Sequence, residues 1–277
     1  MHIRFTKTSS ILNNTHRHFS EIAPKYRNLR TTDLEPIVFI TNKLHHLPKI
    51  HIAKVGCGNG RYAVEFFRHL GNKCHIHCID KNHSMLRQME EQFKQYNIKN
   101  FQVIKSDAEK IPLGTDSIDS LVTFNAVHHF HLTKFLMEAT RILKDNAQLF
   151  VYTRLRIQNA RNIWGRYFPM FHEKETRLYE LDELEEAIEK TPNLKLNSVQ
   201  VFEYQRVSNL ERLVEQARHK HYSTFSLYTK KEFEESLHKF KENILKNFED
   251  PDSISWKDEN VLLVIDNLQG VSYRNKV

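Results

Sequence analysis

The apolar positions along the chain follow two periods. From residue 50 onward, apolar runs of strand length alternate with stretches in which apolar residues recur every three or four positions, as on one face of a helix. The runs predict seven strands, over residues 50–55, 74–79, 101–105, 117–124, 147–153, 194–204 and 261–265. The helical stretches predict helices over residues 61–70, 84–96, 132–143, 181–190, 210–221 and 231–248.

This alternation of strands and helices indicates the α/β fold class, with a doubly wound, mostly parallel, seven-stranded Rossmann-like sheet. Residues 18–30 and 33–47 add a helical N-terminal segment, and the helices before the last strand indicate a helical cap insertion. The domains that we expect are an N-terminal helical lead-in or cap at 1–48, a Rossmann-like core at 49–205, the helical cap at 206–257, and the last core strand with a tail at 258–277.

The composition is that of a packed protein. Hydrophobic residues make up 40% of the 277 residues and charged residues 27%, which excludes a disordered chain, a collagen and a coiled-coil rod. No stretch reaches the roughly 18 consecutive apolar residues of a membrane helix, and the N-terminus lacks the apolar core of a secretory signal. The three cysteines, Cys57, Cys74 and Cys78, are too few and too clustered for a disulfide framework. We therefore expect a cytoplasmic protein without an integral membrane segment.

The charge permits an acidic partner without requiring one. Lys and Arg number 41 and Asp and Glu 34, which gives a formal net charge of +7. Arginines alternate with aromatic residues between Arg154 and Phe168, a pattern that suits either a nucleic acid or an apolar substrate pocket. Because this stretch directly follows the fifth predicted strand, at the ligand edge of the sheet, the pocket is the preferred interpretation.

The sequence Cys74-His75-Ile76-His77-Cys78 contains residue types that bind metals. Successive residues of a strand point to opposite faces, so the cysteines and the histidines should not converge on one ion. We therefore predict a buried strand here and no metal site.

A glycine-rich loop, Gly56-Cys57-Gly58-Asn59-Gly60, separates the first predicted strand from a helix. Glycines allow a tight turn and a close approach of ligand to backbone, and the helix N-terminus attracts an anion. Asp80 ends the next strand 20 residues after Gly60, where its carboxylate can accept hydrogen bonds from both ribose hydroxyls. A dinucleotide fingerprint has G-x-G-x-x-G, whereas Arg61 occupies the place of the third glycine. This spacing suits a ligand with an amino-acid carboxylate better than a pyrophosphate.

Further motifs follow the glycine loop in order along the chain. They are Asp80, Ser106-Asp107-Ala108-Glu109-Lys110-Ile111-Pro112-Leu113 with Ser117–Val122, and Asn125-Ala126-Val127-His128-His129-Phe130. In this combination, residues 49–153 resemble the class I S-adenosylmethionine-dependent methyltransferases, in the methyltransferase 11 branch that includes quinone-biosynthesis methyltransferases. Residues 19–26 are similar to the lead-in of the same branch.

The resemblance implies that the chain binds S-adenosyl-L-methionine and transfers its methyl group by in-line displacement. Such a reaction depends mainly on aligning the acceptor and excluding water. The resemblance assigns the methionine part to the glycine loop, the ribose to Asp80 and the adenine to Asp107. The cofactor-binding residues that it implies are Gly56, Cys57, Gly58, Gly60, Asp80, Lys81, Met85, Asp107, Ala108 and Asn125.

We expect the acceptor to be a small, partly apolar molecule. No general base is assigned, because the weak candidates for a catalytic residue, His128, His129 and Tyr26, include two histidines that more simply shape the cofactor pocket. The segment Tyr222–Tyr228 is aromatic and uncharged, so it either lines an apolar pocket or packs as a hydrophobic linker within the cap. The expected substrate pocket comprises Tyr26, His129, Trp164, Tyr222 and Phe225.

Other functions stay open at this point. The net charge allows an RNA methyltransferase, and the fold alone would also suit a non-catalytic S-adenosylmethionine-binding protein, although the intact glycine loop, Asp80 and Asp107 argue against the latter. A nucleotide-dependent oxidoreductase is opposed by the missing third glycine. The loop that begins at Asn125 contains neither an N-P-P-Y sequence nor a cysteine. These absences argue against methylation of amide or adenine nitrogens and of cytosine C5.

Overall fold

A computed structural model describes residues 17–23 and 29–268. The chain forms two compact units, each built from three separate segments. The sheet unit comprises Thr32–Thr153, Glu180–Phe202 and Val261–Val277, and the helical unit comprises Met1–Thr31, Arg154–Tyr179 and Glu203–Asn260.

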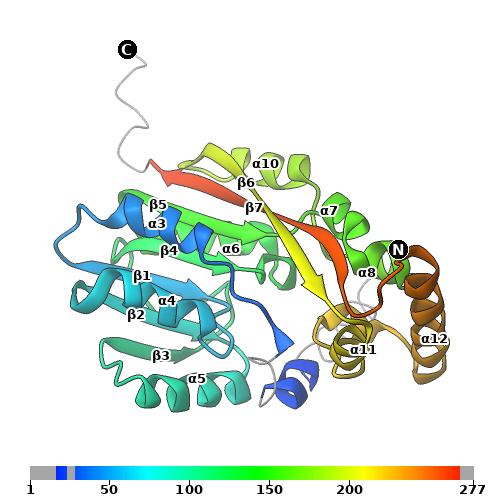
Figure 1. Ribbon diagram of the computed structural model, residues 1–277. Helices are drawn as coiled ribbons and strands as arrows, with labels where there is room; N and C mark the ends of the chain where they lie inside the picture. Colours follow the sequence, from blue (N-terminus) through cyan, green and yellow to red (C-terminus); the bar gives the residue numbers. More distant parts are fainter. Residues whose placement is uncertain (1–16, 24–28, 269–277) are drawn as a thin grey trace. The chain divides into compact units, whose positions relative to one another are not determined.

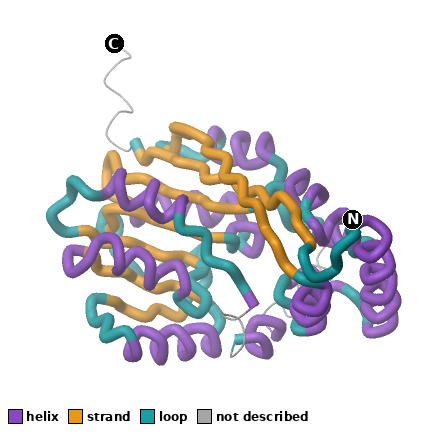
Figure 2. Tube along the Cα trace, viewed as in Figure 1, coloured by secondary structure: helices purple, strands orange, loops and turns teal. Residues whose placement is uncertain are grey.

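The sheet has seven strands in the order β3-β2-β1-β4-β5-β7-β6, shown in Figures 1 and 2. They are β1 (Ile50–Val55), β2 (Cys74–Asp80), β3 (Phe101–Lys105), β4 (Ile118–Phe124), β5 (Leu143–Thr153), β6 (Leu194–Ser208) and β7 (Ile254–Asn267). Strands β1 to β5 pair in parallel, and β7 runs antiparallel to β5. The predicted fold class is thereby confirmed: seven strands, mostly parallel, with crossover helices between them.

Helices cover both faces of the sheet (Figure 1). They are α3 (Glu35–Leu44), α4 (Arg61–Leu70), α5 (His83–Gln95), α6 (Leu132–Ile142) and α10 (Leu181–Glu189). The apolar residues of α3, α4 and α5 form one buried cluster with Ile52, Ile76, Val122 and Phe150 of the sheet. Residues that alternate with these along the strands, such as Leu121 and Leu149, are also fully buried, as are Phe135 and Ala139 of α6. Both faces are therefore covered, as a parallel sheet requires.

The helical unit has an aromatic core. Its helices are α7 (Arg156–Arg161), α8 (Ile163–Tyr167), α9 (Phe171–Lys174), α11 (Leu210–Arg218) and α12 (Lys230–Asn247), with the short 3₁₀ helix η3 (Ser223–Leu227). Trp164 stacks on Phe240 with ring centroids 5.1 Å apart, and Phe168 contacts Phe225 edge to face at 5.0 Å. Both geometries are favourable for aromatic pairs, which explains how a small unit of short helices gains a packed interior.

Two of the expected domain boundaries differ from the structure. Residues 33–47 were expected to belong to the N-terminal cap, but α3 lies in the sheet unit because Ile37, Ile40 and Leu44 are buried in the cluster over the sheet. Residues 154–179 were expected in the core, but they belong to the helical unit, whose aromatic interior includes Trp164. Apolar spacing predicted the helix within residues 33–47 but none of the helices within residues 154–179, and it did not identify the elements against which either segment packs.

The last two strands are longer than predicted. Strand β6 continues to Ser208, and β7 begins at Ile254, so both run from one unit into the other along the chain. Within the helical unit the extensions are linked by an ion pair between Lys257 and Glu203, with 2.8 Å between nitrogen and oxygen. Consecutive polar residues interrupt these extensions, at Gln205-Arg206 and at Lys257–Asn260, so the apolar runs that predict strands do not include them. Among the described residues, no helix combines the length and the apolar character needed to span a lipid bilayer.

Replacing Phe225 by Ala should destabilise the protein. The side chain is fully buried in the aromatic core, and truncating such a phenylalanine typically costs about 3–5 kcal/mol. Leu245→Ala on α12, at a position that is 57% exposed, is the matched control and should change stability by less than about 0.5 kcal/mol. Urea unfolding followed by circular dichroism measures both. Equal midpoints for the two variants would contradict the placement of Phe225 in the core.

Candidate functional site

The glycine loop adopts a conformation that demands glycine. Gly56, Gly58 and Gly60 have φ values of 63°, 56° and 82°, in the left-handed region that side chains disfavour. A Cβ at Gly56 would lie 2.5 Å from the Cβ of Ala126, and one at Gly60 would lie 2.4 Å from Cγ of Met89. The first and third glycines therefore let the loop pack closely against its neighbours.

Gly58 differs, because a Cβ there would meet no atom within 4 Å. The middle of the loop thus faces open space. The next residue, Asn59, is buried, and among the described residues its Oδ1 has no hydrogen-bond partner. An open approach beside an unpaired buried acceptor fits a ligand that carries a hydrogen-bond donor such as an ammonium group. The glycine loop therefore fits the amino-acid end of the expected cofactor.

Asp80 links the end of β2 to the glycine loop. Its Oδ2 accepts a hydrogen bond of 2.8 Å from the backbone N–H of Gly58, and its Oδ1 accepts one of 2.9 Å from the N–H of Asn82. Burial raises the pKa of the Asp80 carboxyl, although both N–H groups and the charges of Lys54 and Lys81 lower it. Each carboxylate oxygen keeps a further lone pair, so Asp80 can still accept hydrogen bonds from a ligand's hydroxyls.

The segment after β3 lies beside Asp80. The N–H of Ser106 donates to the backbone oxygen of Asp80 at 3.2 Å, which brings Asp107 and Ala108 to the same edge. Asp107 is exposed and Ala108 is buried, so a polar and an apolar side chain stand next to each other there. Glu109 accepts a hydrogen bond of 2.7 Å from the N–H of His131 and ties this segment to the loop after β4.

The loop after β4 completes this edge of the sheet. Asn125 has a φ of 50°, and its N–H donates to the backbone oxygen of Tyr152 at 2.7 Å. His128 and His129 follow in a short 3₁₀ helix, η2 (Val127–His129), with ring centroids 4.0 Å apart. Ala126 in this loop is the neighbour that the first glycine accommodates. The sequence motifs thus meet at the carboxyl ends of parallel strands, where ligands bind in α/β sheets.

Two of the predicted cofactor contacts lie around α5. Asn82 caps this helix by accepting a hydrogen bond of 3.0 Å from the N–H of Met85, whose side chain is buried. Lys81 is partly exposed and lies between Asp80 and the cap. Cys57 is buried, with its Sγ 3.8 Å from Sδ of Met89. Asn82, which the motif comparison did not identify, fixes both Asp80 and the start of α5.

The sequence analysis also did not identify Lys54, a buried lysine close to the glycine loop. Lys54 is 1% exposed, and its Nζ lies 3.4 Å from the backbone oxygen of Gly56. Burial lowers the pKa of Lys54 to about 8. A lysine within an apolar strand, two residues before the first glycine, was the available signal.

The described residues expected to line the substrate pocket belong to both units. Trp164 and Phe225 are packed in the aromatic core of the helical unit, which favours the hydrophobic-linker interpretation of that segment. Tyr222 is half-buried, and the guanidinium of Arg30 lies 4.2 Å from its ring centroid. His129 lies in the sheet unit, and Tyr26 falls outside the described residues.

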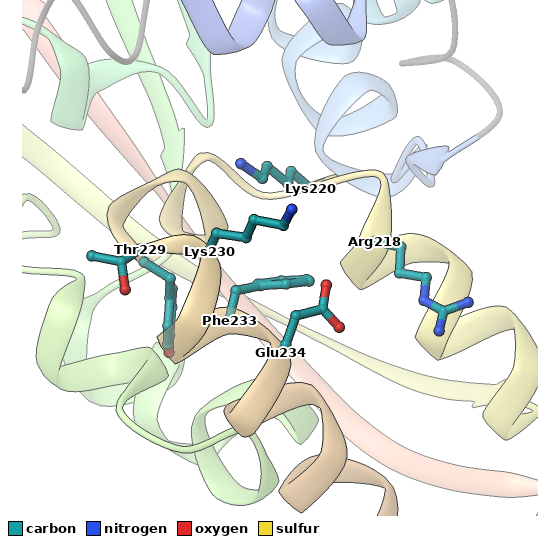
Figure 3. Close-up of a pocket in the computed structure, with 7 residues that line it drawn as sticks. Arg218, Lys220, Thr229, Lys230, Phe233 and Glu234 are labelled. Carbon is teal, nitrogen blue, oxygen red and sulfur yellow. The ribbon is translucent and has the colours of Figure 1, made fainter.

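A cavity of about 480 Å³ lies in the helical unit (Figure 3). It is lined by Arg218, Lys220, Tyr228, Thr229, Lys230, Phe233 and Glu234. Figure 3 shows the side chains of Arg218, Lys220 and Lys230 extending in different directions, so the cationic groups do not converge on one point. The cavity contains none of the residues that the sequence motifs identify.

The Cys74–Cys78 strand behaves as predicted in its geometry. Both cysteines are buried in the cluster with Ile76, whereas the rings of His75 and His77 lie 4.8 Å apart outside this cluster. The two residue types therefore do not converge. Among the described residues, no group of three or more histidine, cysteine, aspartate or glutamate side chains has an arrangement that could hold a metal ion.

Comparisons with known proteins match the part of the chain that contains the glycine loop and the motifs after it. A family model described as a methyltransferase domain matches residues 52–146. The tRNA (carboxymethyluridine(34)-5-O)-methyltransferase of Mus musculus is 26% identical over 159 residues, which cover 55% of this chain and 21% of the relative. The demethylmenaquinone methyltransferase of Listeria welshimeri is 22% identical over 65% of this chain and 81% of the relative. The chain thus spans only about a fifth of the length of the mouse protein.

The fold is similar to that of solved structures. A protein described as a methyltransferase from Bacillus halodurans C-125 superposes with a TM-score of 0.61 and 16% sequence identity. The superposition covers 86% of this chain and all of that one. The likeness at this identity establishes the fold alone, so the chemistry has to be argued from the site.

Replacing Gly58 by Ala should weaken binding of the expected cofactor more than it weakens the fold. The added methyl group would occupy the open space over the loop, and the left-handed backbone costs about 1–2 kcal/mol. Gly71→Ala is the control, because Gly71 also has a positive φ, 61°, with no atom near its Cβ position, but ends α4 away from the loop. Calorimetry with S-adenosylhomocysteine and thermal unfolding should separate the two. Equal loss of affinity in both variants would contradict an approach over Gly58.

Proposed function

Since residues 52–146 are a methyltransferase domain of the class I, S-adenosylmethionine-dependent type, we propose that this chain methylates a small, partly apolar molecule. One observation carries the proposal. The glycine loop is tied to Asp80 through the Gly58 N–H, and the space over Gly58 is open. An amino-acid site and a ribose acceptor are thereby held next to each other, as one adenosylated amino acid requires.

Different residues at this edge of the sheet bind different parts of the cofactor. In the proposal, the glycine loop and Asn59 hold the amino-acid end, Asp80 holds the ribose, and Asp107 with Ala108 frames the adenine. Lys81 and Met85 flank the ribose or adenine, Cys57 fills space within the loop, and Asn125 closes the methionine end. The cofactor supplies a methyl group already activated on a sulfonium. The chain's own contribution is therefore binding, orientation and exclusion of water.

No residue is assigned as a general base. Such a base is needed only where the acceptor must lose a proton before or during transfer. His128 and His129 lie in the loop after β4, and both are partly exposed. They stand as the first positions to test once an acceptor is known, together with Tyr26.

A small molecule is favoured over RNA because three of the four arginines of the 154–166 stretch have intramolecular partners. Arg154 pairs with Asp258 at 2.5 Å with both side chains nearly buried, and Arg161 pairs with Glu259 at 2.7 Å. Arg156 donates to the backbone oxygen of Leu178 at 2.9 Å. Neutralised or internally bonded arginines contribute little to binding a phosphate backbone. The tRNA-modifying relative keeps RNA as the second candidate.

We also infer a cytoplasmic location from the cysteines. Cys57, Cys74 and Cys78 are all free thiols and all buried. Free thiols are usual where glutathione and thioredoxin keep proteins reduced. Fractionation of cells that express the tagged full-length chain tests this inference, and recovery in an oxidising compartment would contradict it.

Replacing Asp80 by Ala should weaken binding of S-adenosylhomocysteine at least tenfold at pH 7. Hydrogen bonds to a charged acceptor contribute about 1.5–3 kcal/mol each, and about 1.4 kcal/mol corresponds to a factor of ten. Asp182→Ala on the exposed start of α10 is the control and should bind as the wild type does. Calorimetry measures affinity, and transfer of labelled methyl from S-adenosylmethionine to a metabolite extract measures activity. If Asp80→Ala binds as tightly as the control, the ribose assignment is wrong.

Binding to RNA should be weak and non-specific at physiological salt. Each phosphate neutralised on a single strand adds about 0.7 to the logarithmic salt slope, so arginines that are already paired within the chain should add little to the slope. Filter binding of total tRNA over a salt series, with Arg161→Ala as the variant, measures this slope. Tight binding at physiological salt that depends on Arg161 would reverse the order of the two candidates.

A further inference from the structure

The side chain of Lys54 is wholly buried without an ion-pair partner. It is 1% exposed, and among the described residues no carboxylate lies within ion-pair distance of its Nζ. Its contacts are the backbone oxygen of Gly56 at 3.4 Å and the ring of Phe124, whose centroid lies 5.2 Å away. Lysine is rarely buried without a partner, since removing an ammonium from water is costly. The charge at this position therefore calls for an explanation beyond packing.

The register of the sheet places Lys54 on the same face as Asp80. Lys54 of β1 pairs with Cys78 of the neighbouring strand β2, and paired residues of adjacent strands point to the same face. Asp80 lies two residues beyond Cys78, so it also points to this face. Lys54 and Asp80 are therefore diagonal neighbours on one face of adjacent strands, and the charge of Lys54 lowers the pKa of the Asp80 carboxyl.

The other titratable groups around this pair leave Lys54 as the main buried cation. Cys57 and Cys78 lie next to it, and burial raises the pKa of the Cys57 thiol well above its usual value. Arg61 at the start of α4 and Lys81 after β2 are the further cations. Arg61 interacts with Thr32 and with the ring of Tyr62, and Lys81 is partly exposed to solvent.

We propose that Lys54 is a positioning residue of the cofactor site, whose buried ammonium keeps Asp80 ionised and so able to accept hydrogen bonds from the ribose. The inference rests on the proposed function, and it adds that a buried positive charge stabilises the carboxylate that would bind the ribose. Burial alone disfavours the carboxylate form of Asp80, and a protonated carboxyl would lose acceptor capacity. The lysine therefore acts through Asp80 and does not need to touch the cofactor.

The pH dependence of cofactor affinity distinguishes this role from a packing role. Without the positive charge, Asp80 should take up a proton at higher pH, so affinity should begin to fall at higher pH as the solution is acidified. At pH 8, where Asp80 is ionised in both proteins, the affinities should be similar. A packing defect would instead lower affinity by the same factor at every pH.

The experiment measures the dissociation constant of S-adenosylhomocysteine by calorimetry from pH 5 to pH 8. The proteins compared are the wild type, Lys54→Met, Lys54→Arg and Asp80→Asn, with circular dichroism as the check on folding. For Lys54→Met we expect affinity about tenfold below wild type at pH 6 and within about twofold of it at pH 8. Lys54→Arg should have the wild-type dependence of affinity on pH. Asp80→Asn should show no loss of affinity as the pH is lowered.

Three results would overturn the inference. A Lys54→Met profile parallel to that of the wild type would show that the lysine only packs. If the affinity of Asp80→Asn still falls as the pH is lowered, a group other than Asp80 is responsible. If the wild type binds S-adenosylhomocysteine at no pH, the proposed function itself fails, whereas the first two results leave that function intact.

Discussion

The hydrogen bond between the Gly58 N–H and Asp80 is the contact on which the site depends. It joins the loop after β1 to the end of β2 at 2.8 Å, and the same carboxylate fixes the N–H of Asn82 at the start of α5. The left-handed glycines are needed to turn the chain so that this N–H points at the carboxylate. A single side chain thus fixes both the glycine loop and the start of α5, and in the proposed function it also accepts hydrogen bonds from the ribose.

The sheet unit could be predicted closely from the sequence, because its elements alternate and are buried in a regular way. Strand β1, helix α4 and strand β3 begin and end at the predicted residues. The glycine loop and Asp80 could be found because they serve the backbone conformation as well as the ligand. Lys54 could not be assigned a role from the sequence. Its place on the same face as Asp80 depends on the register between β1 and β2, which no local pattern specifies.

The helical unit was less predictable for a physical reason. Its interior is formed by aromatic side chains from short helices far apart in the sequence, such as Trp164 and Phe240. An uncharged aromatic segment looks the same whether it lines a pocket or fills a core, and Phe225 turns out to fill the core. The arginines of residues 154–161 were equally ambiguous, because only the fold reveals their partners Asp258 and Glu259.

The position of β7 in the sheet has a consequence for the synthesis of the chain. In the strand order, β7 lies between β5 and β6, although it is the last of the three to be made. Strand β6 has only β7 as a neighbour in the sheet, so it cannot pair there until β7, which begins at Ile254, is made. The parallel half of the sheet can pair earlier, since β1 to β5 precede residue 154. Assembly of the second half thus follows synthesis of the helices between β6 and β7.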